Sequence, residues 1–545
     1  MIGKMKVLIV DPHAGIWPHS RTSFQISRAL LDMGHRVKYL GCGKGMLDRC
    51  HVNESVNRAL VFNDLNPDCK KCSSTEGLIF NSLGRSENFD STTIEALLIN
   101  NDEILKVEMN RLLQLVRKGK PLSSANSYVP VSDLAMYETH LRFKLRDLSD
   151  LTKIQRSYHL AFTLNALRAS HASIRLSREF NPDIVFAYSP QYSAVGASAW
   201  VFEKNGIPVI FVEGSASLYE RHTHLRMWNW GEFGLNNPRL EDYHFTTLSE
   251  TEKSRVEKHF DVIKKGSHYS VYSPKMRVIN FKEHFNLLEF DKIALLAMSS
   301  SDEIGAAQSI NRLPKRARES NVFATQLEWL RFTMEWFREN PKLACVVRPH
   351  PRDFSTRREP HEAQHVSDLQ AVLRDKPDNV VVDDPKAALP LWAYFAEIQV
   401  LITGWSGSAL EAIYNQVPVL TYDEKLLPYP TSLVTTGLTL EDYQNNLGAI
   451  MQSDRNSYSS RKEEMFSWLN HSFSHEIVRI HGRFFEFFRI RSTYFNKMLS
   501  VYERFMPKTY RYLDIFSLRR KDNLKTQVDI ARIIDKNSKI ACSES

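Results

Sequence analysis

Short apolar runs alternate with longer amphipathic stretches through most of the chain. Each run is about four to six residues long, is rich in β-branched residues and ends abruptly in polar or glycine-containing sequence. This is the pattern of buried parallel strands whose carboxyl ends open onto loops. The predicted strands fall into two groups, 6–10, 37–40, 183–188 and 208–212 in the first, and 292–298, 344–348, 379–382, 400–403 and 417–421 in the second. The sequence therefore predicts an α/β protein with two sheets covered by helices.

The first group opens as a strand, a helix and a strand. The helix is predicted from about residue 20 to 33, and Gly34 suits its C-cap, so the opening is Rossmann-like. No Gly-x-Gly-x-x-Gly follows the first strand, which argues against a dinucleotide cofactor. Apolar residues at helical spacing predict helices across 92–179, with a break at Pro130 and a second run from 133 to 178.

Two loops of the second group carry candidate phosphate ligands. Arg348 and His350 lie in the sequence Arg-Pro-His-Pro after one strand, and the two prolines restrict the shape of that loop. Ser406, Gly407 and Ser408 follow another strand and lead into a predicted helix, whose N-terminus favours an anion. Ligands bind at the carboxyl ends of strands in such sheets. A guanidinium can donate two hydrogen bonds to a phosphate, so we expect a diphosphate or phosphodiester pocket. The alternative for the serine loop is a tight turn with a serine cap.

These motifs resemble the sugar-nucleotide site of bacterial GT-B glycosyltransferases, including the capsule Kdo transferases, bacterial sialyltransferases and teichoic-acid polymerases. The likeness lies in the Arg-x-His-Pro loop, the Ser-x-Ser helix start with Glu-Ala about fifty residues later, and a Val-Pro-Val strand. It implies that Arg348 and His350 contact donor phosphate, that Ser406 and Ser408 cap it, and that Glu411 lies near the ribose. It also implies two Rossmann-like domains facing a cleft. A CMP-linked acidic sugar is the first donor that the resemblance suggests.

The same resemblance suggests residues on the acceptor side. Glu213 stands before a glycine at the end of a predicted strand, where related transferases carry the base that deprotonates the acceptor hydroxyl, although their motif has two acids. The alternative is a glutamate that receives backbone N–H bonds in a turn. Asp11 and His13, in the loop after the first strand, would contact the acceptor or else serve only the turn. Ser299 and Ser300 follow the strand at 292–298 and are further candidates for donor contacts.

Four of the six cysteines lie within 31 residues, namely Cys42, Cys50, Cys69 and Cys72. The last two form a Cys-Lys-Lys-Cys knuckle, and four thiolates are a ligand set for tetrahedral zinc. A full set of protein ligands favours a structural site. An iron–sulfur cluster and free or redox-paired thiols are the alternatives. No catalytic metal is expected, because the chain has no Asp-x-Asp motif.

Composition places the chain among ordinary globular proteins. A length of 545 residues predicts two or three domains, and 43% hydrophobic with 25% charged residues is a globular balance. No apolar run approaches the ~20 residues of a membrane helix. The apolar run at the start is too short for a secretory signal, so we expect a cytoplasmic protein.

The net charge is concentrated near the C-terminus. Residues 477–521 hold eleven Lys and Arg against three Asp and Glu, which equals the whole net charge of +8. Aromatic residues alternate with these basic ones, a composition that suits an amphipathic segment on the anionic inner-membrane surface. The alternative is a C-terminal helix that packs on the first domain. Nucleic acid is not expected as a partner, since no recognised binding module accompanies the charge.

Together these features predict a GT-B protein with a cysteine-rich insertion and a C-terminal helical segment. The predicted parts are 1–275 with insertions 42–75 and 92–179, 276–475 for the nucleotide sugar, and a basic helical tail, 476–545. The predicted activity is transfer of a sugar from a nucleotide donor to a surface-polysaccharide or lipid-linked glycan acceptor. The alternatives are an NDP-sugar epimerase of the same fold and a non-catalytic polysaccharide assembly factor.

Overall fold

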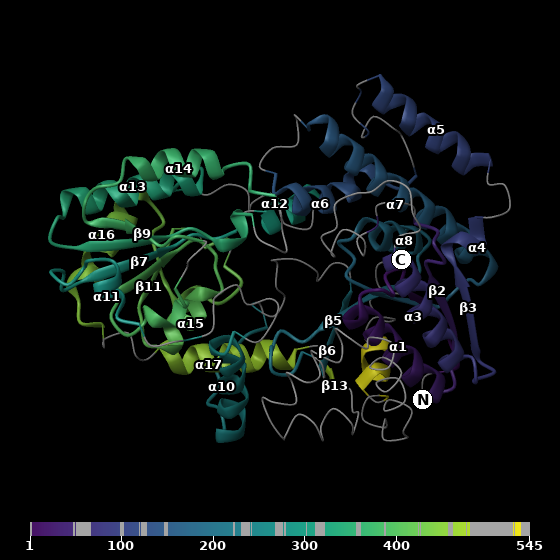
Figure 1. The fold of residues 1–545 in the computed structure, drawn as a ribbon. Helices are drawn as coiled ribbons and strands as arrows, with labels where there is room; N and C mark the ends of the chain where they lie inside the picture. The colour runs from purple at the N-terminus through teal and green to yellow at the C-terminus, as the bar shows by residue number, and fades with distance from the viewer. Residues whose placement is uncertain are drawn as a thin grey trace.

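The computed structural model contains two α/β bodies, each built on its own sheet (Figure 1). The purple and blue body holds most of the first 230 residues, and the green body holds the second sheet. The structure describes residues 3–46, 50, 67–98, 103–118, 120, 122, 128–145, 151–221, 224–229, 240, 242–266, 276, 279–300, 302–310, 322–355, 361–385, 389–422, 424–425, 427–455, 461–475, 477–479, 527 and 529–535.

The first sheet has the strand order β13-β6-β5-β4-β1-β2-β3. Its strands are β1 (Lys6–Val10), β2 (Arg36–Gly41), β3 (Phe89–Thr93), β4 (Ile184–Tyr188), β5 (Val209–Gly214), β6 (His224–Asn229) and β13 (Ile477–Arg479). The strands from β3 to β5 pair in parallel, whereas β6 pairs antiparallel with both β5 and β13. The parallel part therefore has the Rossmann order, with its switch point between β1 and β4.

The helices of the first body follow the predicted rhythm, except that α3 was not predicted and that two predicted helical runs have different bounds. They are α1 (Trp17–Asp32), α3 (Pro67–Leu83), α4 (Ile94–Leu98), α5 (Glu103–Arg117), α6 (Val131–Phe143), α7 (Lys153–Glu179) and α8 (Ser193–Lys204). Helix α1 begins earlier than predicted because a proline occupies its first turn, where no N–H bond is lost. The helical run predicted from 133 to 178 is two helices. Lys144 ends α6 in the left-handed conformation, and Thr152 begins α7 with a capping box.

The second sheet is entirely parallel, with the order β12-β11-β10-β7-β8-β9. Its strands are β7 (Ile293–Ala297), β8 (Ala344–Arg348), β9 (Val380–Val382), β10 (Val400–Thr403), β11 (Val419–Thr421) and β12 (Thr435–Thr436). This is the six-stranded Rossmann order with the switch point between β7 and β10. Every residue of β7, β8 and β10 is buried, because helices cover both faces.

The second body also includes many helices. They are α10 (Glu250–Lys264), α11 (Phe281–His284), α13 (Gln326–Glu339), α14 (Val366–Arg374), α15 (Ser408–Tyr414), α16 (Leu440–Gln452) and α17 (Arg461–Ser474), with short 3₁₀ turns η4 (Pro351–Asp353), η5 (Leu391–Ala393) and η6 (Thr431–Leu433). Helix α12 (Asp302–Ser309) follows β7 in the chain but packs against α6 of the first body (Figure 1). Helix α10 lies in the segment that the predicted division gives to the first domain. Its Phe260 nevertheless packs in the second core, with ring centroids 4.3 Å from Tyr414 and 6.2 Å from Trp392.

The chain returns to the first body after α17 (Figure 1). The prediction of a helical tail is wrong at its start, because Ile477–Arg479 form β13 and pair with β6. Residues 529–535 are helical, and Ile530, Ile533 and Ile534 are buried in the core of the first sheet. These described parts of the tail pack on the first domain. Most of the basic aromatic segment lies outside the described residues, and no described helix is long and apolar enough to span a bilayer.

Candidate functional site

A cavity of about 250 Å³ opens at the carboxyl ends of β7, β8 and β10. This is the switch point of the second sheet, where open α/β folds bind ligands. Its polar lining comprises six of the residues predicted to hold the donor, namely Arg348, His350, Ser406, Gly407, Ser408 and Glu411. Leu218, from the loop after β5, and Ile263, from α10, are among the apolar residues that also line the cavity. The two predicted loops therefore meet in one place.

Arg348 is held by an acidic partner, Asp383, which no sequence pattern indicated. Its Nη1 donates to Asp383 Oδ2 at 2.6 Å and to the Leu389 carbonyl at 2.7 Å. The guanidinium also lies 5.7 Å from the centre of the Tyr394 ring. Burial raises the pKa of Asp383 while the positive charge of Arg348 lowers it. Arg348 thus lines the cavity with its positive charge partly compensated by Asp383. It is not the fully available bidentate phosphate ligand that the sequence suggests.

The loop turn that contains His350 fixes the hydrogen-bonding role of one of its ring nitrogens. Its Nδ1 accepts the backbone N–H of Arg352 at 3.2 Å, which makes His350 the N-cap of η4. Burial lowers the pKa of His350, so the ring is neutral near pH 7. Because Nδ1 is an acceptor, the single proton of the neutral ring is on Nε2. The prolines on either side hold the loop that presents this Nε2–H donor.

The serine loop enters α15 through a local hydrogen-bonded turn. Ser406 Oγ accepts from the backbone N–H of Ser408 at 3.2 Å and from Ser408 Oγ at 2.9 Å. Gly407 is the N-cap residue and makes no side-chain cap. The two hydroxyls are therefore adjacent on the cavity wall, as the Ser-x-Ser spacing predicts.

Glu411 faces the cavity from the first turn of α15. Its Oε2 accepts a hydrogen bond from Trp392 Nε1 at 2.6 Å, which fixes the carboxyl group. Burial raises the pKa of Glu411 to about 7, against smaller lowering effects of Trp392 and Arg348. The group therefore changes charge close to neutral pH.

Ser299 and Ser300 lie outside the lining of this cavity. Ser299 is 3% exposed and joins two loops, because its N–H donates to Gln326 Oε1 at 3.0 Å and its Oγ accepts from Trp405 N at 3.2 Å. Ser300 donates to Asp302. Their observed contacts are thus within the protein.

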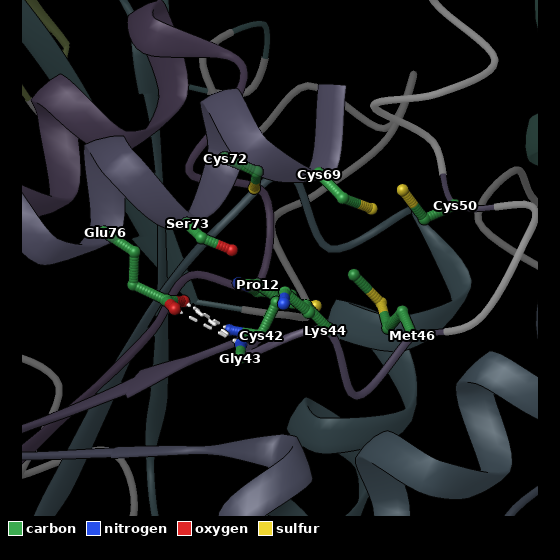
Figure 2. Close-up of a pocket in the computed structure, with 10 residues that line it drawn as sticks. All are labelled: Pro12, Cys42, Gly43, Lys44, Met46, Cys50, Cys69, Cys72, Ser73 and Glu76. Carbon is green, nitrogen blue, oxygen red and sulfur yellow. Dashed lines mark hydrogen bonds between the residues drawn. The ribbon is translucent and has the colours of Figure 1, made fainter. Parts of the chain in front are cut away.

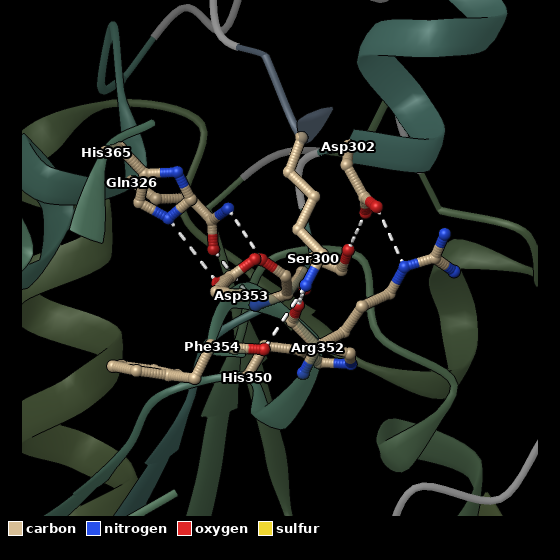
Figure 3. A network of polar contacts seen from close by, with 10 residues as sticks. Ser300, Asp302, Gln326, His350, Arg352, Asp353, Phe354 and His365 are labelled. Atoms are coloured by element: carbon tan, nitrogen blue, oxygen red, sulfur yellow. Dashed lines mark hydrogen bonds and ion pairs between the residues drawn. The ribbon is translucent and has the colours of Figure 1, made fainter. Parts of the chain in front are cut away.

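A buried polar network supports the loop after β8 (Figure 3). Arg352 Nε donates to Asp302 Oδ2 at 2.8 Å, and both side chains are buried. Lys144, at the end of α6, donates from Nζ to the carbonyl groups of Arg352 and Phe354, the latter at 3.2 Å. The loop that carries His350 is therefore also a contact between the two bodies, which no sequence pattern indicated.

Glu213 lies at the carboxyl end of β5, as predicted, beside a cation from the neighbouring strand. Arg226 is its register partner on β6, and Arg226 Nη1 lies 3.6 Å from Glu213 Oε1. The Glu213 side chain keeps 27% of its surface exposed. Gly214 is required by space, since a Cβ there would be 2.8 Å from Arg221 Cγ. Glu213 is not part of the lining of the cavity in the second body.

Asp11 and His13 are buried in the loop after β1. They are 2% and 3% exposed. Asp11 accepts a hydrogen bond from Tyr39, and burial raises the pKa of Asp11 to about 6. Burial lowers the pKa of His13 to about 4, and its ring packs edge-on against Tyr192 at 5.9 Å between centroids. Both residues serve the packing of this loop rather than an open surface.

The four clustered cysteines are brought together at a separate place, near the end of β2 (Figure 2). Cys42 follows β2, whereas Cys69 and Cys72 lie on the first turns of α3. Helix α3 was not predicted, because its apolar residues show no strong helical stripe.

Comparisons with known proteins add little about chemistry. No family model and no curated protein matches the chain. Solved structures that it resembles include a putative UDP-N-acetylglucosamine 2-epimerase from Listeria monocytogenes, with 9% identity, a TM-score of 0.26 and coverage of 93% of this chain and 98% of that one. A Methanocaldococcus jannaschii UDP-GlcNAc 2-epimerase in complex with UDP-GlcNAc and UDP has 12% identity, a TM-score of 0.28 and coverage of 85% and 98%. The calicheamicin glycosyltransferase CalG4 has 12% identity, a TM-score of 0.25 and coverage of 86% and 96%.

Identities of 9–12% with TM-scores of 0.25–0.28 do not indicate a function. The fold is identified from the two strand orders and from the helices that surround each sheet (Figure 1). The chain consists of two Rossmann-like bodies, which is the GT-B architecture.

Proposed function

We propose that this chain is a glycosyltransferase that binds a sugar nucleotide in the cavity of the second body. The observation that carries the proposal is the meeting of His350, Ser406, Ser408 and Glu411 at one switch point, from loops more than fifty residues apart. Neutral donors and a carboxyl group in one cavity suit a ligand with phosphate at one end and ribose hydroxyls at the other.

Each residue has a proposed role that its contacts support. His350 Nε2–H and the two serine hydroxyls donate to the phosphates, and ionised Glu411 accepts from the ribose. Arg348 supplies positive potential from behind, although its Nη1 is engaged by Asp383. As the bond to the leaving phosphate breaks, these preorganised groups stabilise the negative charge that develops, in place of a divalent ion.

The acceptor hydroxyl attacks the anomeric carbon from the side of the first body in this proposal. Glu213 is the proposed base, because it is a partly exposed carboxylate at a strand end of that body. The proposed acceptor is a surface polysaccharide or a lipid-linked glycan, reached from the inner-membrane surface. A CMP-linked acidic sugar is the first donor to test, by resemblance alone.

The first test is calorimetric binding of CMP, CDP, UDP and GDP to the full chain. We expect one nucleotide to bind selectively and His350→Ala to weaken it by about 1.5–3 kcal/mol, the scale for a hydrogen bond to a charged group. His244→Ala is the matched control, because His244 is an exposed histidine away from the cavity lining. Equal affinity of wild type and His350→Ala would remove His350 from the site, and failure of all four nucleotides to bind would favour an assembly factor.

The epimerase of the same fold is the second candidate, and it would use the same cavity for the sugar nucleotide. An epimerase changes the sugar nucleotide without an acceptor. Sugar derivatives of the nucleotide that binds are therefore incubated with the protein alone, which distinguishes an epimerase from a transferase. A new stereoisomer in the NMR spectrum without acceptor would establish epimerisation. Transfer that requires an added glycan and is lost in Glu213→Gln would establish the transferase.

A further inference from the structure

Four cysteines from three parts of the sequence line one small cavity beside β2 (Figure 2). They are Cys42, Cys50, Cys69 and Cys72. The cavity has a volume of about 10 Å³, which is room for one water or one ion. Cys69 and Cys72 are one helical turn apart and therefore present their side chains on the same side of α3.

None of the four cysteines forms a disulfide. Cys42 and Cys50 are buried, 8% and 7% exposed, whereas Cys69 and Cys72 are partly buried. All four side chains line the same cavity, so their sulfur atoms share one environment.

The backbone around Cys42 forms a tight turn. Gly43 has φ +58, and a Cβ there would lie 2.3 Å from Thr93 Oγ1. At Gly41 a Cβ would lie 2.1 Å from Glu76 Oε1, so a larger residue there would displace the carboxyl group that accepts the N–H of Cys42. The N–H of Gly45 then donates to the Cys42 carbonyl at 2.8 Å and closes the turn.

Two further contacts support the cysteines from outside. Glu76 lines the cavity, but its Oε1 accepts the N–H of Cys42 at 2.6 Å and its Oε2 accepts the N–H of Gly43 at 3.2 Å. Glu76 therefore stabilises the turn at Cys42. Gly15 N donates to Cys72 Sγ at 3.1 Å, the kind of N–H to sulfur bond that orients a thiolate ligand.

We propose that Cys42, Cys50, Cys69 and Cys72 bind one zinc ion through four thiolate sulfurs. Four soft sulfur donors around a single-ion space select a tetrahedral ion such as Zn²⁺. Lys44, which also lines the cavity, offsets part of the net negative charge of the tetrathiolate. Among the described residues, no three acidic, histidine or cysteine side chains already meet as a metal site, so binding turns the cysteine side chains toward the centre of the cavity.

The ion has a structural role in this proposal. It joins the end of β2 to the start of α3, and the Gly15 contact extends the connection to the loop that holds Asp11 and His13. Because an ion bound only to the folded state adds its binding free energy to folding, loss of zinc destabilises the first body. The nucleotide cavity of the second body does not depend on it.

The test is the metal content of the full chain, purified without chelator or added metal under anaerobic conditions. We expect about one zinc per chain, with X-ray absorption showing four sulfur neighbours at about 2.3 Å. The double variant C69S/C72S should retain less than a tenth of the zinc. Cys345→Ala is the matched control and should retain all of it, because Cys345 is a buried thiol of β8 in the second sheet.

Several outcomes would overturn the proposal. They are metal-free protein with four titratable thiols, a disulfide between any two of the four cysteines, stoichiometric iron, or zinc that stays bound in the double variant. If the double variant fails to fold, stepwise blocking of thiols in the wild type with a mercurial decides instead. Zinc released in step with the blocking of four thiols supports the site, and zinc that stays bound after all four are blocked contradicts it.

Discussion

The ends of β1 and β4 in the first sheet occupy the same topological place as the ends of β7 and β10 in the second. At the first of these two switch points, histidine and tyrosine rings pack on one another. His19 stacks on Tyr188 with centroids 4.1 Å apart, and His13 packs on Tyr192. In the second crevice, polar side chains surround a cavity of about 250 Å³. The two switch points therefore differ in their side chains, with packed rings in the first sheet and polar groups around a cavity in the second.

The two crevices also differ in the charge state of their side chains. Burial lowers the pKa of His13 to about 4 and of His19 to about 3, so both rings are neutral packing groups. In the second crevice, each polar group that lines the cavity is positioned by a partner behind it. Asp383 holds Arg348 and Trp392 holds Glu411. Changes in the first crevice should thus affect stability alone, whereas changes in the second should affect binding, and also stability where they break a buried ion pair.

The largest expected effect is the loss of the partner of Arg348. Asp383→Ala leaves the buried guanidinium without its carboxylate, and breaking such a pair costs about 3–5 kcal/mol. We expect this loss in urea unfolding followed by tryptophan fluorescence. Asp384→Ala is the control, because the adjacent Asp384 is exposed, and a change of less than about 0.5 kcal/mol is expected there. Equal effects of the two variants would contradict a buried ion pair behind the cavity.

An intermediate effect is expected in the first crevice. Tyr39→Phe removes the hydroxyl that donates to buried Asp11 and should cost about 1–3 kcal/mol of unfolding free energy. Nucleotide affinity, measured by calorimetry, should not change. Tyr128→Phe, at an exposed tyrosine, controls for loss of a hydroxyl. A Tyr39→Phe protein that folds normally but binds nucleotide more weakly would mean that the first crevice contributes to the same site.

The smallest expected effect is a pH dependence of sugar-nucleotide binding. The pKa of Glu411 is raised to about 7, so the carboxylate that accepts ribose hydroxyls forms as the pH rises through that value. Affinity should therefore increase by up to about tenfold between pH 6 and pH 8, and linkage then requires proton release on binding. Glu411→Gln should abolish this pH dependence. A sugar nucleotide is the appropriate probe because its esterified phosphates do not titrate in this range. An affinity that is independent of pH in the wild type would exclude Glu411 from the contact.

Local pattern predicted the strands that are buried on both faces. The runs at 6–10 and 400–403 coincide with β1 and β10, since continuous β-branched apolar sequence has few other ways to be buried. Strands β3 and β6 were missed because they are polar or lie toward the antiparallel edge, where the apolar signal is weak. Helix α10 shows that a predicted domain boundary does not decide which core a helix joins.

The sequence by itself determined the two-sheet plan, the pairing of the Arg-Pro-His-Pro and Ser-x-Ser loops as candidates, and the cysteine cluster, because strand periodicity and loop chemistry are local properties. Only the tertiary structure decided that Asp383 faces Arg348, that Trp392 holds Glu411, and that Asp11 and His13 are buried. Those contacts join residues that are distant in the chain. Their partners are set by how strands and loops are packed in space, which short-range patterns do not encode.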